Sequence, residues 1–394
     1  MKILLFTYLF PNSKLPNRGI FNLSRAKALI KAGCEVIAVA PVSVNPSISS
    51  LLSPSKIKEQ FSFLKILKSI PSVEHYEGIK AYHPKWITAP RKIFWKHILN
   101  ILHFFIGRKL DEIISEFQPD LIISTWLNPF SAYSKYFKKY SGVKHFAIAE
   151  GSDLLVQPLN YNGWDKIENS INENSNLVIA VSEKMKNRME QTTKLQRIKF
   201  IQNGYDESIF YLDEKAEKTH DKYFRIITVA NFNYAKGHDI LLEALQYIKI
   251  PFKLTLIGEG PLLNKCNKFI EEHGLQNVVN NIGPIPHNNI PGLLLNHDLF
   301  CLPSRSEGFP AAPLEAMACG LPVVAANVGG MNEIIIEGFN GFLCKPESPE
   351  DIAEKINVAS GIQWEKEKIS EWASNNFSWN SWAAKIIDSY NNLN

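Results

Sequence analysis

Cysteine is scarce in this chain of 394 residues, and its five cysteines are scattered without a CxxC pair or a nearby histidine cluster. This pattern argues against a disulfide framework or a zinc site, and we expect buried, reduced thiols. A run of about 18 uncharged apolar residues is also missing, so we expect no transmembrane helix. The apolar start MKILLFTYLF continues into PNSKLPNRG without a small-residue cleavage site. We therefore interpret it as a buried first strand and not as a signal peptide.

Several ligand-binding motifs are missing as well. No GxGxxG follows the first predicted strand, which argues against an NAD-dependent α/β enzyme. No Asp-x-Asp motif stands at a predicted strand end, so we expect no metal and no other cofactor. No nucleic-acid-binding motif is recognisable, so we expect no nucleic-acid partner.

The composition is that of a globular protein, with 45% hydrophobic and 21% charged residues. The length exceeds one ordinary core and favours two domains. Charge divides unevenly between them: residues 1–200 hold 28 basic and 15 acidic residues, whereas the remainder holds 15 basic and 24 acidic residues. A basic first half favours an anionic surface or acceptor as its partner.

Both halves alternate predicted strands and helices, which indicates parallel α/β sheets. In the first half we predict a helix around Ile20–Ala32 and further helices at Lys109–Phe117 and Asp165–Glu173. Its predicted strands are Lys2–Tyr8, Glu35–Val42, Gly78–His83, Asp120–Ser124, His145–Ala149, Leu177–Val181 and Lys199–Gln202. The second half repeats the pattern from Arg225–Phe232 onward, after a charged linker at Asp213–Lys222. Two doubly wound domains with a cleft between them are the expected assembly.

The segment FCLPSRSEGFPAAPLE (Phe300–Glu315) carries the strongest functional pattern. An apolar strand runs through a loop of Gly, Pro and Ser into a helix predicted from Pro313 to Ala318. Ligands bind at such strand ends in open α/β sheets, and a helix N-terminus favours a phosphate.

Two glutamates, Glu307 and Glu315, bracket this loop. Eight helical residues would separate them by about 12 Å, too far for a glycosidase pair, which needs roughly 5–9.5 Å. A clamp on two parts of one long ligand fits the spacing better. A surface Glu beside a helix-capping Glu is the ordinary alternative.

In this context, SEGFPAAPLEAMACGLPVVAANVGG closely resembles the motif of glycosyltransferase family 4, retaining enzymes with the GT-B fold. VANFNYAKGHDILLEAL, LIGEGP, GFNGFLCKPESPEDIAEKI, IQNGYDESIF and FSWNSWAAKIIDSY resemble further family segments. The resemblance implies two Rossmann-like domains with an interdomain cleft. They would be an acceptor-binding domain at residues 1–205 and a nucleotide-sugar domain at 206–375. A C-terminal helix at 376–394 would return to the first domain.

The resemblance also implies residue roles. Glu315 would bind the ribose hydroxyls of the nucleotide, Glu307 would contact the donor sugar, and Lys236 would neutralise the diphosphate. Backbone N–H groups around Gly308, Phe309, Pro310, Ala311 and Ala312 would meet the sugar or phosphates. Residues around Ile285 would select the base. An exposed turn lysine is the ordinary alternative for Lys236.

Three positions depart from the family's pattern. Asn231 stands where relatives often carry Arg, so Lys236 or another cation, such as Arg305 or Lys345, would have to compensate. Gly19 is a single glycine in a loop where relatives often carry two. It would let the backbone approach the donor phosphates closely, or it would only begin a helix without a ligand role. Glu150 replaces a frequent His. Glu150 or Asp153 would then orient acceptor hydroxyls or polarise the sugar, with a helix N-cap as the alternative for Asp153.

The stretch Trp86–Leu110 is basic and aromatic, with apolar residues at helical spacing. It fits either a peripheral contact with an anionic membrane, giving access to a lipid-linked acceptor, or a core helix with a solvated basic face. We favour the core helix slightly.

The resemblance implies a retaining glycosyltransferase of bacterial cell-surface polysaccharide biosynthesis (capsule, exopolysaccharide or lipopolysaccharide). It would move a sugar from a UDP- or GDP-sugar to a glycan or lipid-linked saccharide. We expect a cytoplasmic protein, with a peripheral contact on the inner face of the membrane left open. A catalytically silent GT-B scaffold is the main alternative, and an NAD-dependent α/β enzyme a weaker one.

Overall fold

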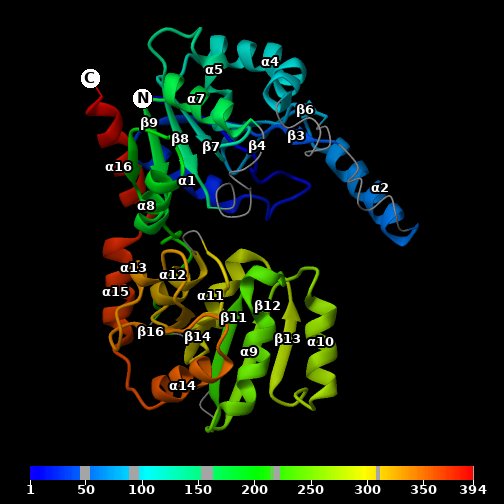
Figure 1. The fold of residues 1–394 in the computed structure, drawn as a ribbon, viewed down its shortest axis with the longest axis vertical. Coiled ribbons are helices and arrows are strands. Elements are labelled where there is room, and N and C mark those ends of the chain that lie inside the picture. Colours follow the sequence, from blue (N-terminus) through cyan, green and yellow to red (C-terminus); the bar gives the residue numbers. More distant parts are fainter. Residues whose placement is uncertain are drawn as a thin grey trace. The chain divides into compact units, whose positions relative to one another are not determined.

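The computed structural model describes residues 1–44, 54–87, 97–151, 163–213, 215, 222–307 and 311–393, without the side chains of 54–61. The chain divides into two compact units (Figure 1). Unit 1 comprises Met1–Val181, Lys186–Ile201 and Trp382–Asn394, and unit 2 comprises Ser182–Met185 and Gln202–Ser381. The C-terminal helix α16 (Trp379–Asn391) therefore begins in unit 2 and ends in unit 1.

Unit 1 contains an eight-stranded sheet in the order β10-β9-β8-β7-β1-β2-β5-β4. All neighbours pair in parallel except the edge strand β4. The strands are β1 (Lys2–Phe6), β2 (Glu35–Val39), β4 (Val73–Tyr76), β5 (Ile79–Tyr82), β7 (Leu121–Thr125), β8 (Lys144–Ala149), β9 (Leu177–Ala180) and β10 (Ile198–Phe200). Short strands β3 (Val42–Ser43) and β6 (Lys85–Trp86) pair separately.

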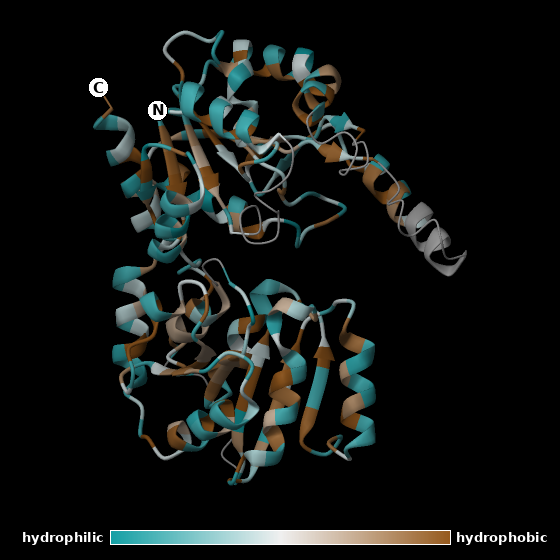
Figure 2. Cartoon of the chain, viewed as in Figure 1, coloured by the Kyte–Doolittle hydropathy of each residue, from teal (hydrophilic) through white to brown (hydrophobic). Residues whose placement is uncertain are grey.

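The helices of unit 1 connect these strands in βαβ fashion. They are α1 (Ile20–Lys31), α2 (Pro54–Ser69), α4 (Ile98–Phe117), η3 (Ser131–Tyr133), α5 (Ser134–Phe137), α7 (Trp164–Asn174) and α8 (Glu183–Thr192), which starts in unit 2. The inner strands are mostly apolar and largely brown in Figure 2, as expected for a sheet covered on both faces.

Unit 2 contains a six-stranded, fully parallel sheet in the order β13-β12-β11-β14-β15-β16. Its strands are β11 (Phe224–Val229), β12 (Phe252–Ile257), β13 (Val279–Gly283), β14 (Leu299–Leu302), β15 (Val323–Ala326) and β16 (Gly341–Cys344). The helical elements are η4 (Tyr234–Lys236), α9 (His238–Ala244), η5 (Leu245–Tyr247), α10 (Leu263–Glu272), η6 (His287–Asn289), α11 (Ile290–Leu295), α12 (Ala311–Ala318), α13 (Met331–Ile334), α14 (Pro349–Ser360) and α15 (Lys366–Asn376).

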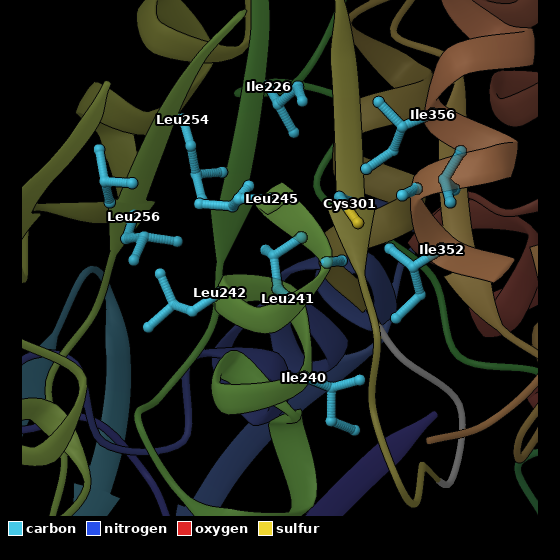
Figure 3. Packing of buried hydrophobic residues seen from close by; sticks show 14 of the residues in the cluster. Ile226, Ile240, Leu241, Leu242, Leu245, Leu254, Leu256, Cys301, Ile352 and Ile356 are labelled. Atoms are coloured by element: carbon cyan, nitrogen blue, oxygen red, sulfur yellow. The ribbon is translucent and has the colours of Figure 1, made fainter. Parts of the chain in front are cut away.

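Apolar side chains from α9 and α14 pack against the strands of this sheet (Figure 3). Ile226 of β11 and Cys301 of β14 are fully buried, and so are Leu241 of α9 and Ile352 of α14. Burial of an aliphatic side chain contributes about 1.5–3 kcal/mol. This packing holds the strands of unit 2 in place beneath their loops.

The predicted strands and helices are present with shifted ends. The strand expected to reach Val42 ends at Val39, because the following Pro41 cannot donate a ladder hydrogen bond. The helix expected from Lys109 already begins at Ile98, where Ile98, Leu102 and Ile106 extend its buried face. All five cysteines are buried and free.

Candidate functional site

The candidate site of unit 2 lies at the carboxyl ends of its strands, where the strand order reverses. Strand β11 has β12 on one side and β14 on the other, so the chain leaves β11 and β14 at the switch point of a doubly wound sheet. The loop after β11 carries Asn231 and Lys236, and the loop after β14 carries Glu307. Topology therefore brings together residues that are 71 positions apart in the sequence.

Lys236 and Glu307 form a close ion pair. The Nζ atom of Lys236 lies 2.6 Å from Oε1 of Glu307, and Ser304 Oγ donates to the same oxygen at 2.6 Å. The Lys236 side chain keeps 25% of its surface exposed, whereas Glu307 keeps only 8%. A partly exposed ammonium is therefore held at the strand ends by a nearly buried carboxylate.

Arg305 ties the two loops together. Its guanidinium makes a bidentate contact with Asp239 at 2.9 and 3.0 Å and donates to the Tyr234 carbonyl at 3.0 Å. It also lies 4.1 Å from the centroid of the Tyr234 ring. Burial opposes ionisation of Asp239, but the hydrogen bonds from Arg305 outweigh it and lower the pKa of the carboxyl. Arg305 thus fixes the loop of Lys236, and its charge is already matched by a carboxylate.

Gly329, in the glycine-rich segment after β15, packs closely against the backbone of Glu307. Its φ is +59°, and a Cβ atom there would lie 2.2 Å from the Glu307 carbonyl oxygen. A side chain at this position would displace the backbone that carries Glu307. The close approach keeps Glu307 in its buried position.

Glu315 lies on α12 with 12% of its side chain exposed. Its Oε1 is 3.1 Å from Nε2 of His287, which belongs to η6. The helix begins at Ala311, earlier than the predicted Pro313. Proline is tolerated in a first turn, where N–H groups have no intrahelical acceptor. Ala311 and Ala312 therefore form the first turn at the loop end.

The other predicted donor-binding positions are distributed around this edge. Asn231 is exposed directly after β11, and Ile285 is half-buried between β13 and η6. Gly308, Phe309 and Pro310 lie outside the described residues.

In unit 1, Gly19 caps the start of α1 with φ 78°. A Cβ atom there would lie 2.6 Å from the Leu9 carbonyl carbon and oxygen. The close packing of the β1–α1 loop on itself therefore requires glycine, whatever its role toward a ligand.

Glu150 follows β8 directly and pairs with a fully buried arginine. Arg25 of α1 donates from its two terminal nitrogens to the two carboxylate oxygens of Glu150 at 2.5 and 3.2 Å. The guanidinium also donates to Asn22 at 3.0 Å and lies 5.4 Å from the Trp382 ring of α16. Glu150 is therefore a charge-compensated carboxylate. Asp153 lies outside the described residues.

His287 and Arg25 were not predicted as site residues from the sequence. One sequence feature could have indicated Arg25: it is a charged residue between Leu23 and Leu29, on a helix with an otherwise apolar face. Its partner Glu150 is 125 positions away, and no sequence pattern connects them. Among the described residues, no group of three or more His, Cys, Asp or Glu side chains could hold a metal ion. Within the same ranges, no helix is long and apolar enough to cross a membrane.

Two family models match the chain in succession. The Glycosyltransferase Family 4 model matches residues 19–209, and the Glycosyl transferases group 1 model matches residues 211–376. An uncharacterized glycosyltransferase of Methanocaldococcus jannaschii is 32% identical over 237 residues, which is 60% of this chain and 64% of that relative. The alignment thus spans less than two thirds of that relative. The putative teichuronic acid biosynthesis glycosyltransferase TuaC of Bacillus subtilis is 24% identical over 387 residues, 94% of this chain and 92% of TuaC.

Solved structures share the fold. Sucrose-phosphate synthase from Thermosynechococcus elongatus superposes with a TM-score of 0.77 at 18% identity, covering 100% of this chain and 99% of that one. Anabaena HepE, solved in complex with UDP, gives a TM-score of 0.68 at 20% identity and covers 100% of both chains. The predicted fold of two Rossmann-like α/β domains of the GT-B type is confirmed. Because the two models together match nearly the whole chain, this protein belongs to glycosyltransferase family 4.

Proposed function

We propose that this protein is a retaining glycosyltransferase that moves a sugar from a nucleotide-sugar to an acceptor hydroxyl. The observation that carries the proposal is the Lys236–Glu307 pair at the switch point of the second sheet. In this proposal the Lys236 ammonium would meet the diphosphate and the adjacent Glu307 carboxylate would meet the sugar hydroxyls. The same edge is where open α/β sheets bind ligands.

In the proposed reaction, the bond between the anomeric carbon and the diphosphate oxygen breaks, and a bond to the acceptor oxygen forms on the same face. The acceptor proton passes to the departing phosphate. Negative charge grows on the diphosphate as the bond breaks, and a preorganised Lys236 ammonium stabilises it. Because Arg25 already matches the charge of Glu150, we assign Glu150 to orienting hydroxyls and not to removing the proton. No metal enters this scheme, so transfer should continue in EDTA.

Unit 2 is the proposed donor-binding part. Glu315 would accept hydrogen bonds from the ribose hydroxyls, and the backbone near Ile285 would contact the base. The complexes of HepE with UDP and with UDP-glucose support a nucleotide-sugar as donor, through the shared fold.

Unit 1 is the proposed acceptor-binding part, for a glycan or a lipid-linked saccharide. The relative TuaC, named for teichuronic acid biosynthesis, favours a bacterial cell-surface polysaccharide as the product. Helix α4 buries Leu102 and Ile106 but leaves Phe104 84% exposed, close to the exposed Arg108 and Lys109. We propose that this face makes a peripheral contact with the inner leaflet of the cell membrane, where a lipid-linked acceptor is available.

A panel of UDP-, GDP- and ADP-sugars, with NAD as a comparison, tests the donor assignment by ligand-induced thermal stabilisation. At least one nucleotide-sugar should raise the melting temperature, and NAD should not. Donor hydrolysis without acceptor then separates an active enzyme from a silent scaffold. Stabilisation by NAD alone, or binding of a nucleotide-sugar without any hydrolysis or transfer, would contradict the proposal.

A further inference from the structure

His287 and Glu315 form a contact that joins two separate segments of unit 2. Nε2 of His287 lies 3.1 Å from Oε1 of Glu315, across 28 positions of sequence. The imidazole ring packs against the Phe210 ring in a T-shaped arrangement, with ring centroids 4.9 Å apart and planes inclined by 64°. Both side chains are mostly buried, with 22% of His287 and 12% of Glu315 exposed. The ring is thus held by Phe210 on one side and by the carboxylate on the other.

The electrostatic surroundings favour an N–H donor at this contact. Burial opposes the charged form of His287, but the hydrogen bond and negative charge of Glu315, together with the charge of Asp206, raise the pKa of the imidazole above its usual value. A histidine that donates to a carboxylate fixes which oxygen is used and how the carboxylate is turned.

Fixing a glutamate before a ligand arrives has a measurable consequence. Ordering a free Glu side chain costs conformational entropy, and a preordered side chain avoids that cost at binding. A ribose presents neighbouring hydroxyl groups that require a defined orientation of the acceptor oxygens. If the carboxylate were free to rotate, the site would bind a ribose and a 2′-deoxyribose with a smaller difference in affinity.

We propose that His287 is a positioning residue that turns the Glu315 carboxylate toward the ribose hydroxyls and so sets a preference for ribonucleotides over 2′-deoxyribonucleotides. This assignment rests on the proposed function, in which unit 2 binds a nucleotide-sugar. A purely structural contact between η6 and α12 is the alternative, and it would affect both kinds of nucleotide equally.

Calorimetric titration with UDP and 2′-deoxy-UDP separates the positioning role from a purely structural contact. If the donor panel selects guanine or adenine, the corresponding ribonucleoside and 2′-deoxyribonucleoside diphosphates are used. His287→Leu should weaken UDP binding about 5–10-fold and change 2′-deoxy-UDP binding less than twofold. His287→Gln should restore part of the preference, because its amide can donate to Glu315. At saturating donor, kcat should stay near the wild-type value, since ribose contacts are the same in ground and transition states.

A double-mutant cycle links the effect of His287 to Glu315. Glu315→Ala should remove most of the preference, and adding His287→Leu to it should have no further effect on the UDP to 2′-deoxy-UDP ratio. Melting temperatures verify that each variant is folded. An unchanged ratio in His287→Leu, or equal weakening of both nucleotides, would overturn the positioning role alone. A wild-type protein that binds no nucleotide would overturn both this role and the proposed function.

Discussion

The buried pair of Arg25 and Glu150 shows how single residues in unit 1 depend on each other. Arg25 is fully buried and the Glu150 side chain is 7% exposed, and each of the two carboxylate oxygens receives a guanidinium hydrogen bond. Buried ion pairs add little net stability, but loss of one partner leaves an uncompensated charge. This arrangement fits a carboxylate kept in place for binding and not a device that stabilises the fold.

Arg25→Met should therefore lower the free energy of unfolding by about 3–5 kcal/mol, measured by urea denaturation. The double variant Arg25→Met, Glu150→Leu should recover most of this loss, because no charge stays buried. Arg108→Met, at a side chain that is 95% exposed, is the control and should change stability by less than about 0.5 kcal/mol. A loss below 1 kcal/mol in Arg25→Met would show that the pair is not desolvated as the structure has it.

The residues of the candidate site were predictable to different degrees. Glu307, Glu315 and Lys236 stand in local motifs whose order along the chain marks strand ends. The contacts around them were not predictable, because the pairs Arg305–Asp239 and His287–Glu315 depend on how separate loops meet. Such pairs are set by tertiary packing, which leaves no spacing in the sequence.

At the level of elements, strands with continuous apolar runs were predicted well, since β1, β7 and β14 are buried on both faces. Element ends were less predictable. Helix α12 starts at Ala311, two residues before the predicted Pro313. The early start of α4 at Ile98 follows the buried face that Ile98, Leu102 and Ile106 form. The strand order, which creates the switch point beside β11, also comes from tertiary structure.

Two buried histidines at element ends should make the protein sensitive to acid. Burial lowers the pKa of His145, at the start of β8, to about 3 and that of His238, at the start of α9, to about 4. Their unfolded pKa is near 6.5, so below that pH the unfolded chain binds protons that the folded chain does not. Stability should fall as pH decreases from about 6.5 to 4, by up to about 1.4 kcal/mol per pH unit for each histidine.

Urea midpoints measured between pH 7.5 and 4.5 test this linkage. His145→Gln should reduce the pH dependence, because glutamine does not titrate. Its amide can still hydrogen-bond with Ser124 and Ser175, the partners of the imidazole at 2.8 Å. His75→Gln, at an exposed position of β4, is the control and should leave the dependence unchanged. The same slope in wild type and His145→Gln would contradict the assignment.

At the scale of the whole molecule, basic residues are concentrated in the first 200 positions. The proposed membrane contact of α4 predicts that the protein co-sediments with phosphatidylglycerol vesicles but not with phosphatidylcholine vesicles. About 0.5 M salt should release most of it, because screening weakens contacts with anionic headgroups. Phe104→Ser should weaken binding, whereas Val358→Ser, at an exposed apolar residue of unit 2, should not. Equal binding to both vesicle types, or no effect of Phe104→Ser, would contradict the contact.

Replacement of Lys236 tests the proposed glycosyl transfer by this chain most directly. With the donor selected by the nucleotide-sugar panel, kcat/KM is measured for wild type, Lys236→Met and the exposed control Lys268→Met. Loss of a preorganised charge at a leaving group typically costs about 10²–10³ in rate, so Lys236→Met should fall by that factor while Lys268→Met stays near wild type. A Lys236→Met enzyme within about threefold of wild type would contradict the assignment of the Lys236–Glu307 pair to the reacting diphosphate.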